Sequence, residues 1–164
     1  MFLQEFGRIE AEAFLTLASE LIEEDGIVTA EEDAKLKEYI EASGIRGFTY
    51  DAAAAAAARD TLAQLNETSK RKAYMELFSF AICDRIEAPE ERRALNDLKE
   101  ALALSAEVCN MLEEAVEKLY AAYDVIEAAL EYEEEAPAEE APAEEAAEEA
   151  VSAETDAAAQ ETAE

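Results

Sequence analysis

One short acidic turn is written twice in this chain, and the distance between the two copies constrains the fold more than any other feature. The stretch DGIVTAEE occupies 25–32 and the stretch DRIEAPEE occupies 84–91, so the copies begin 59 residues apart. Each copy follows an apolar run with helical spacing, and each ends in two glutamates that open another such run. Self-similarity at a fixed period indicates an internal repeat. The sequence therefore predicts two helical hairpins, each with a turn that opens with Asp.

The first half of the chain is expected to form three helices. The first should end near Glu24, and its predicted inner stripe consists of Phe6, Ile9, Ala13, Leu17 and Leu21. The second should begin after Thr29, which with Glu32 forms a capping box, and should close at Gly44. Seven alanines at 52–58 should follow Asp51 in a third helix that runs to about residue 65.

The second half predicts three more helices. The fourth should run from about Ser69 to Asp84, and because it is apolar nearly all round we expect it to be the most buried. Pro89 suits the first position of the fifth helix, and Ser105 should cap the sixth. The inner stripe of the sixth helix is predicted to reach the tail through Val108, Leu112, Ala115, Leu119, Tyr123, Ile126 and Leu130. No strand pattern is seen, so the fold class is all-α, a six-helix bundle built from two pseudo-repeated hairpins.

Charge divides the chain into two parts. The 164 residues carry a net charge of −29, and from Tyr132 onward there are 13 acids and no base. We therefore place a helical domain at 1–131, with its own net charge of −16, and an acidic tail at 132–164. The tail repeats Ala-Pro-Ala-Glu-Glu and has little apolar bulk, so it is predicted to be disordered. It either keeps the protein in solution or acts as an electrostatic arm for a basic partner or for divalent cations.

Composition also excludes several functions. The chain has no His, which removes Ser-His-Asp and Cys-His catalysis and every His-ligated metal site. Cys83 and Cys109 have no Cys-x-x-Cys spacing, so buried apolar packing is expected for both. The negative charge argues against nucleic acid and anionic membrane as direct partners. No signal peptide or membrane span is recognisable, so we expect a cytoplasmic, non-enzymatic protein that meets a membrane only through a partner.

The acids of the doubled turn have two interpretations. Acidic side chains in the first turn of a helix stabilise it through the helix dipole, and Glu32 has a specific capping role. Alternatively, if both turns lie at one end of the bundle, their carboxylates could bind a hard divalent cation such as Ca²⁺ or Mg²⁺. The candidate ligands are Asp25, Glu31, Glu32, Asp84, Glu90 and Glu91.

The first copy of the turn also resembles a known family. In TerB-like domains, which occur in tellurite-resistance proteins and at the N-terminus of a DnaJ-type co-chaperone, the turn reads Ala-Asp-Gly-x-Ile/Val-Ser/Thr-x-x-Glu. Asp25, Gly26, Val28, Thr29 and Glu32 match it at the right spacing. In the second copy Asp84, Pro89 and Glu91 fit, whereas Arg85, Glu87 and Ala88 depart from it. The resemblance implies a bacterial, all-helical stress-response module whose acids chelate metal at the inner face of the membrane.

Two functions follow as expectations. The first is a non-enzymatic TerB-like stress-response module that binds divalent cations through the acidic turns between helices. The alternative is a structural or adaptor protein that acts by contact with a basic protein partner, without metal.

Overall fold

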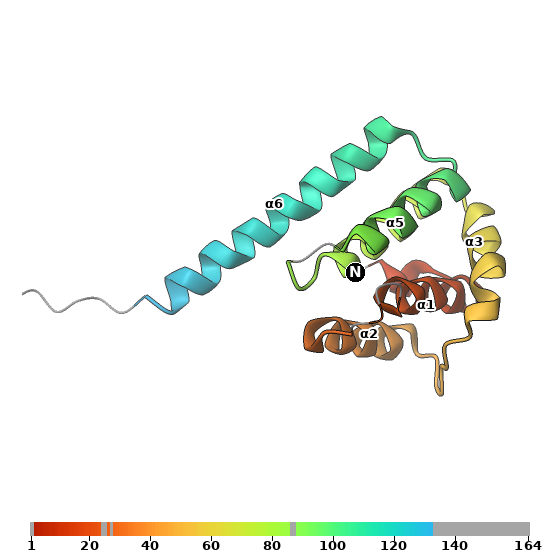
Figure 1. The fold of residues 1–164 in the computed structure, drawn as a ribbon, viewed down its shortest axis with the longest axis horizontal. Helices are drawn as coiled ribbons and strands as arrows, with labels where there is room; N and C mark the ends of the chain where they lie inside the picture. The colour runs from red at the N-terminus through yellow and green to blue at the C-terminus, as the bar shows by residue number, and fades with distance from the viewer. Residues whose placement is uncertain (1, 24–25, 27, 86–87, 133–164) are drawn as a thin grey trace, which may run out of the picture. The chain divides into compact units, whose positions relative to one another are not determined.

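The computed structural model describes residues 2–23, 26, 28–85 and 88–132, and within them the chain is helical (Figure 1). The elements are η1 (Leu3–Glu5), α1 (Arg8–Glu23), α2 (Ala30–Ser43), η2 (Ala52–Ala54), α3 (Ala55–Ala63), α4 (Glu67–Ala81), α5 (Pro89–Ala101) and α6 (Ala106–Leu130). The predicted all-α class with six helices is confirmed. The chain divides into the units Met1–Ala129 and Leu130–Glu164. Apart from Tyr132, the predicted tail lies outside the described residues.

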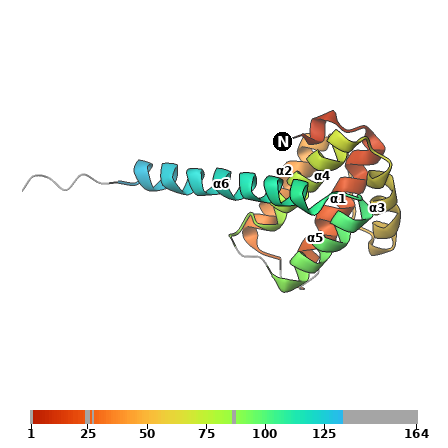
Figure 2. The same cartoon turned by 90° about the horizontal axis from the view of Figure 1, so that it is seen from above.

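The centre of the core is α1 rather than α4. Ten of the 16 residues of α1 are buried, against seven of the 15 in α4. The prediction that α4 is the most buried helix is therefore wrong. The reason is position, because α1 contacts α2, α3, α4 and α5, whereas the first turns of α4 are polar. Figure 2 shows α1 enclosed among the other helices of this unit.

Three aromatic rings connect α1, α2 and α4. The Phe14 ring lies 5.1 Å from the Tyr39 ring in an edge-to-face arrangement, and the Tyr39 ring lies 5.8 Å from Phe80. All three side chains are fully buried. The Tyr39 hydroxyl donates to Oε2 of Glu76 over 2.8 Å, and the Phe2 amide donates to Oε1 over 2.5 Å. Burial, and then the Glu76 carboxylate, raise the pKa of Tyr39. The hydroxyl therefore stays protonated and serves as a donor.

Several predicted boundaries and positions need correction. The alanine run begins as the 3-10 turn η2, with the Asp51 side chain accepting from the Ala53 amide, and α3 ends at Ala63. Asn66 caps α4 by accepting from the Ser69 amide over 3.0 Å, so this helix starts before Ser69. Ile9, expected on the inner stripe of α1, is 72% exposed because it lies in the solvent-facing first turn.

Equivalent positions in the two halves begin their helices alike. Arg8 opens α1 and Glu67 opens α4, while Ala30 opens α2 and Pro89 opens α5. Both pairs are separated by the 59 residues that separate the two acidic turns. The repeat remains a prediction, and these matched starting points support it.

Backbone dihedrals follow the same offset. Gly26 in the first turn has φ 75°, and Arg85 at the equivalent position has φ 66°. Gly44 after α2 has φ 68°, and Ala103 after α5 has φ 54°. The left-handed conformation costs a residue with a side chain roughly 1–2 kcal/mol, whereas glycine adopts it freely. The second half therefore keeps two turns that its own residues disfavour.

The last helix leaves the core partway along its length. Cys109 and Val116 are buried and Leu112 is half-buried, but from 117 to 132 only Tyr120 is even half-buried. The predicted inner stripe of this helix is therefore correct at Val108 and Leu112, which are half-buried. It is wrong at five exposed positions: Ala115, Leu119, Tyr123, Ile126 and Leu130. No other described helix covers these later turns, so apolar residues that read as core in the sequence are left in solvent.

Candidate functional site

The first acidic turn carries a complete capping box. The Thr29 amide donates to Oε2 of Glu32 over 2.7 Å, and the Glu32 amide donates to Oγ1 of Thr29 over 3.2 Å. Glu32 is only 4% exposed. Its carboxylate is thus held by the backbone at the start of α2, as the capping interpretation predicts. Glu31 beside it is exposed.

The second acidic turn keeps half of this arrangement. Oε2 of Glu91 accepts from the Ala88 amide over 2.8 Å, and Glu91 is also 4% exposed. Ala88 has no side-chain oxygen to return the bond. Glu90 forms an ion pair with Arg93, and Asp84 is half-buried. Asp25, the remaining candidate ligand, lies outside the described residues.

Carboxylates from both turns influence the pKa of one side chain, the Cys83 thiol. Burial raises the pKa of this thiol to about 12, and the carboxylates of Glu32, Asp84 and Glu91 contribute to the rise. Within the described residues, however, no three acidic or thiol side chains are grouped so that they could hold a metal ion. Binding of Ca²⁺ or Mg²⁺ stays a prediction.

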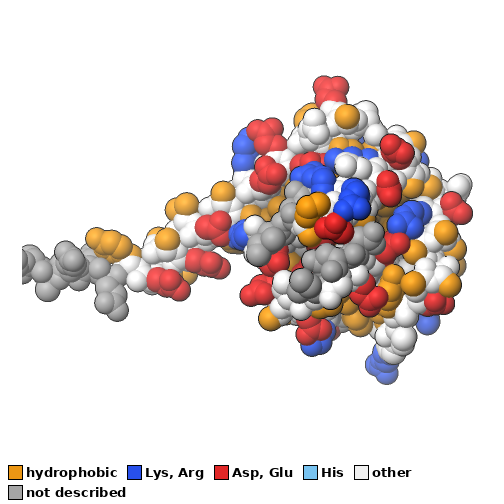
Figure 3. Space-filling model, in the orientation of Figure 1, with side chains coloured by type: hydrophobic (Ala, Val, Ile, Leu, Met, Phe, Trp, Pro, Cys, Tyr) orange, Lys and Arg blue, Asp and Glu red, His pale blue; other side chains and the backbone are white. Residues whose placement is uncertain are grey.

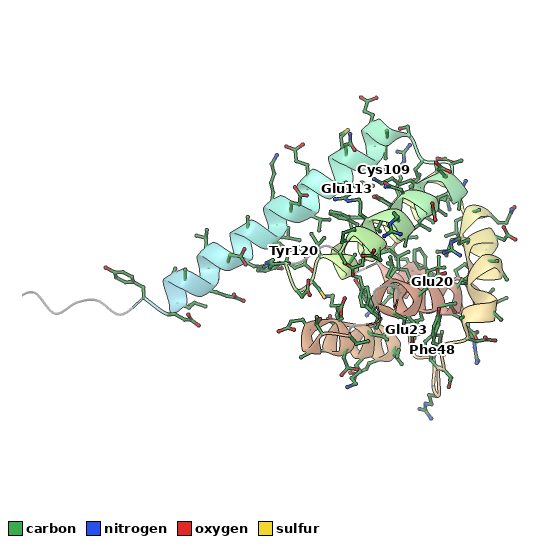
Figure 4. All side chains as sticks on the ribbon, in the orientation of Figure 1. Glu20, Glu23, Phe48, Cys109, Glu113 and Tyr120 are labelled. Carbon is green, nitrogen blue, oxygen red and sulfur yellow. The ribbon has the colours of Figure 1, made fainter. Side chains whose placement is uncertain are left out.

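A second polar cluster connects α6 to the body of the first unit. Oε2 of Glu113 accepts from Arg92 over 3.0 Å, Oε1 lies 2.7 Å from Nζ of Lys99, and the Tyr74 hydroxyl also donates to this carboxylate. Burial alone would raise the pKa of Glu113, but hydrogen bonds from Lys99, Tyr74 and Arg92 lower it on balance. Figure 4 shows Cys109, Glu113 and Tyr120 on the side of α6 that faces the other helices. The ionised carboxylate links α4, α5 and α6.

A groove of about 390 Å³ opens beside this link, between α2, α4 and α6. Its lining includes Lys35, Glu38, Met75, Ser79, Leu119 and Tyr123. The Tyr120 hydroxyl donates to the Ser79 carbonyl over 2.9 Å and so connects α6 to α4 next to the groove. The groove thus has an apolar wall on α6 and a charged rim on α2.

Three exposed apolar side chains continue the groove along the helix, and we call Leu119, Tyr123 and Ile126 the α6 stripe. They are 54%, 50% and 52% exposed. Their spacing of four and then three residues extends the spacing of Cys109, Leu112 and Val116, which face the core. In Figure 3 hydrophobic and acidic side chains are interspersed along α6. Sequence periodicity identified these residues as one face of a helix, but could not show that their partner is missing.

Comparison of the chain with protein-family models, curated proteins and solved structures finds no match. The TerB-like resemblance, with the bacterial stress-response role that it implies, therefore stays a prediction from the turn motif. None of the helices in the described part of the chain is both long enough and apolar enough to span a membrane.

Proposed function

We propose that this chain is a non-enzymatic binding module that engages a protein partner through the α6 stripe and the adjoining groove. One observation supports the proposal above the others. The apolar face that holds the first half of α6 against the core continues into solvent with unchanged spacing. Contiguous apolar surface beside a groove is typical of sites that bind another protein.

The energetic argument rests on what a partner would cover. Fully burying a Leu, Ile or comparable side chain stabilises a complex by roughly 1.5–3 kcal/mol. The three stripe residues are each about half exposed, and the groove supplies the buried wall of Val116 next to them. A partner that covers the stripe and places one side chain in the groove gains from both surfaces.

Site-specific cross-linking tests this proposal. A photoreactive residue replaces Tyr123 in the full chain, and in a matched variant it replaces Val125, which is 69% exposed but off the stripe. In cells we expect a discrete adduct with another protein from position 123 and none from position 125. The adduct should disappear when Leu119→Gln and Ile126→Gln are added, because they remove apolar contact without changing charge.

Two cross-linking results would contradict the proposal. Equal adducts from both positions would mean that α6 meets other molecules without using one face. No adduct from position 123, in cells where the chain is folded and abundant, would remove the binding-module proposal.

Cation binding by the acidic turns is the second candidate function. Its support is that carboxylates from both turns, Glu32, Asp84 and Glu91, contribute to the raised pKa of the Cys83 thiol. Millimolar Ca²⁺ or Mg²⁺ should then raise the melting temperature of the full chain, because a ligand that binds only the folded state stabilises it.

A charge-matched comparison controls the cation experiment. Asp84→Asn with Glu31→Gln should abolish the shift, whereas Glu107→Gln with Glu114→Gln, which removes the same charge elsewhere, should keep it. A shift of the same size in both double variants would show general screening of the −29 charge and would rule out a site in the turns.

A further inference from the structure

Resting on the proposed function, we propose that the partner segment on the α6 stripe is an amphipathic helix with basic residues along one edge of its apolar face. The shape of the site, its charge and the poor fit of other occupants carry this inference.

The shape of the site favours a helix. Apolar positions separated alternately by three and four residues, as at 116, 119, 123 and 126, form the seam of paired helices. The α6 stripe adjoins the groove, because Leu119 and Tyr123 belong to both. A second helix laid along α6 would cover the stripe and insert one bulky side chain between α2 and α6.

The charge beside the stripe favours a basic partner. One edge of the stripe carries acids, with Glu127 next to Ile126 and Glu117 further round the helix, while Asp124 on the same side is already paired with Arg85. The opposite edge carries Ala115 and Ala122. Lys118 forms an ion pair with Glu114, away from this seam. Lysines or arginines on the partner would therefore face Glu127 along one edge, on a chain of net charge −29, and small side chains along the other.

Other occupants fit less well. A second copy of the chain would bring another net charge of −29 against the first. Residues 133–164 of the same chain offer Val151 as their one bulky apolar side chain and add 13 acids, so they supply no apolar helix face.

Two synthetic peptides test the inference with the full chain. Both have three heptads with Leu at the seam positions; one has Lys at the flanking positions and the other has Glu. Fluorescence anisotropy measures their affinities. We expect the Lys peptide to bind at least about 10-fold more tightly than the Glu peptide. Leu119→Gln with Ile126→Gln should weaken the Lys peptide by about 10-fold.

A matched variant separates the stripe from general attraction to the acidic tail. Val125→Gln with Met111→Gln also removes two exposed apolar side chains from α6 and keeps every charge, but both positions lie off the stripe. Affinity for the Lys peptide should be unchanged in this variant. Equal weakening in both double variants would overturn the assignment to the stripe.

The remaining outcomes separate this inference from the proposed function. Equal affinity for both peptides, or no binding of either, would overturn the inference that the partner is a basic helix. The adduct from position 123 independently decides whether α6 binds a protein. Self-association in sedimentation, abolished by the stripe variant and kept by the control, would assign the site to a second copy and overturn the inference.

Discussion

Replacement of Glu113 by alanine is expected to lower the free energy of unfolding by about 2–4 kcal/mol. The change leaves the Arg92 and Lys99 cations and the buried Tyr74 hydroxyl without their shared acceptor. The cost should be below that of a fully buried ion pair because the Arg92 side chain is 36% exposed. Urea unfolding at neutral pH measures the change directly.

The adjacent glutamate offers a matched control. Glu114 pairs with Lys118 over 2.6 Å, but both side chains are mostly in solvent, so Glu114→Ala should lower stability far less than Glu113→Ala. Glu113→Gln should fall between wild type and Glu113→Ala, because the amide oxygen still accepts from Tyr74. Similar losses for Glu113→Ala and Glu114→Ala would show that the cluster does not secure α6.

Lowering the pH should also remove the contribution of Glu113 to stability. The folded pKa of Glu113 is lowered, so its contribution is complete above the unfolded value of about 4.3 and is lost as pH falls through the lower folded value. Between those values wild-type stability should fall more steeply with decreasing pH than that of Glu113→Ala. If the stability of both proteins fell equally with decreasing pH, the pKa of Glu113 would not be lowered in the folded state.

Phe14→Ala is expected to destabilise the chain by about 3–5 kcal/mol, the range for removing a phenyl ring from a closed core. The side chain is fully buried at the centre of α1, and its ring contacts Phe6 and Tyr39. The substitution would leave a cavity between α1, α2 and α4. Because other contacts also hold α2 and α4 in place, these helices should fill the cavity only in part. Thermal and urea unfolding give the loss.

Phe48→Ala is the comparison for this core substitution. Phe48 lies in the connection between α2 and η2 and is only partly buried, so its replacement should cost clearly less than that of Phe14. If both substitutions had the same effect, α1 would not be the centre of the core.

Much of the local structure was readable from sequence, because the interactions that start and stop helices are local. Thr29 with Glu32, Pro89 and Gly44 all act as predicted, since a cap satisfies backbone groups within one turn. The exceptions are also local. Asn66 precedes Ser69 as a cap, and the alanine run opens as a 3-10 turn after Asp51.

The candidate sites were less readable. Periodicity identifies the apolar face of α6 but carries no information on whether another helix lies over it, so Leu119 and Ile126 read as core residues. The acids of the turns allowed two interpretations, helix capping and cation binding, and the structure shows Glu32 and Glu91 buried as acceptors for backbone amides. The Glu113 cluster was missed, because it joins residues from three helices and has no spacing of its own in the sequence.

By itself, the sequence determined that this chain is helical, where most of its helices begin and that two acidic turns recur at one interval. Those properties depend on contacts within a few residues of each position. Only the tertiary structure decided that α1 is the centre of the core, that Glu113 connects three helices and that α6 leaves its core partners after Val116. Burial and pairing depend on segments distant in sequence, which no local pattern specifies.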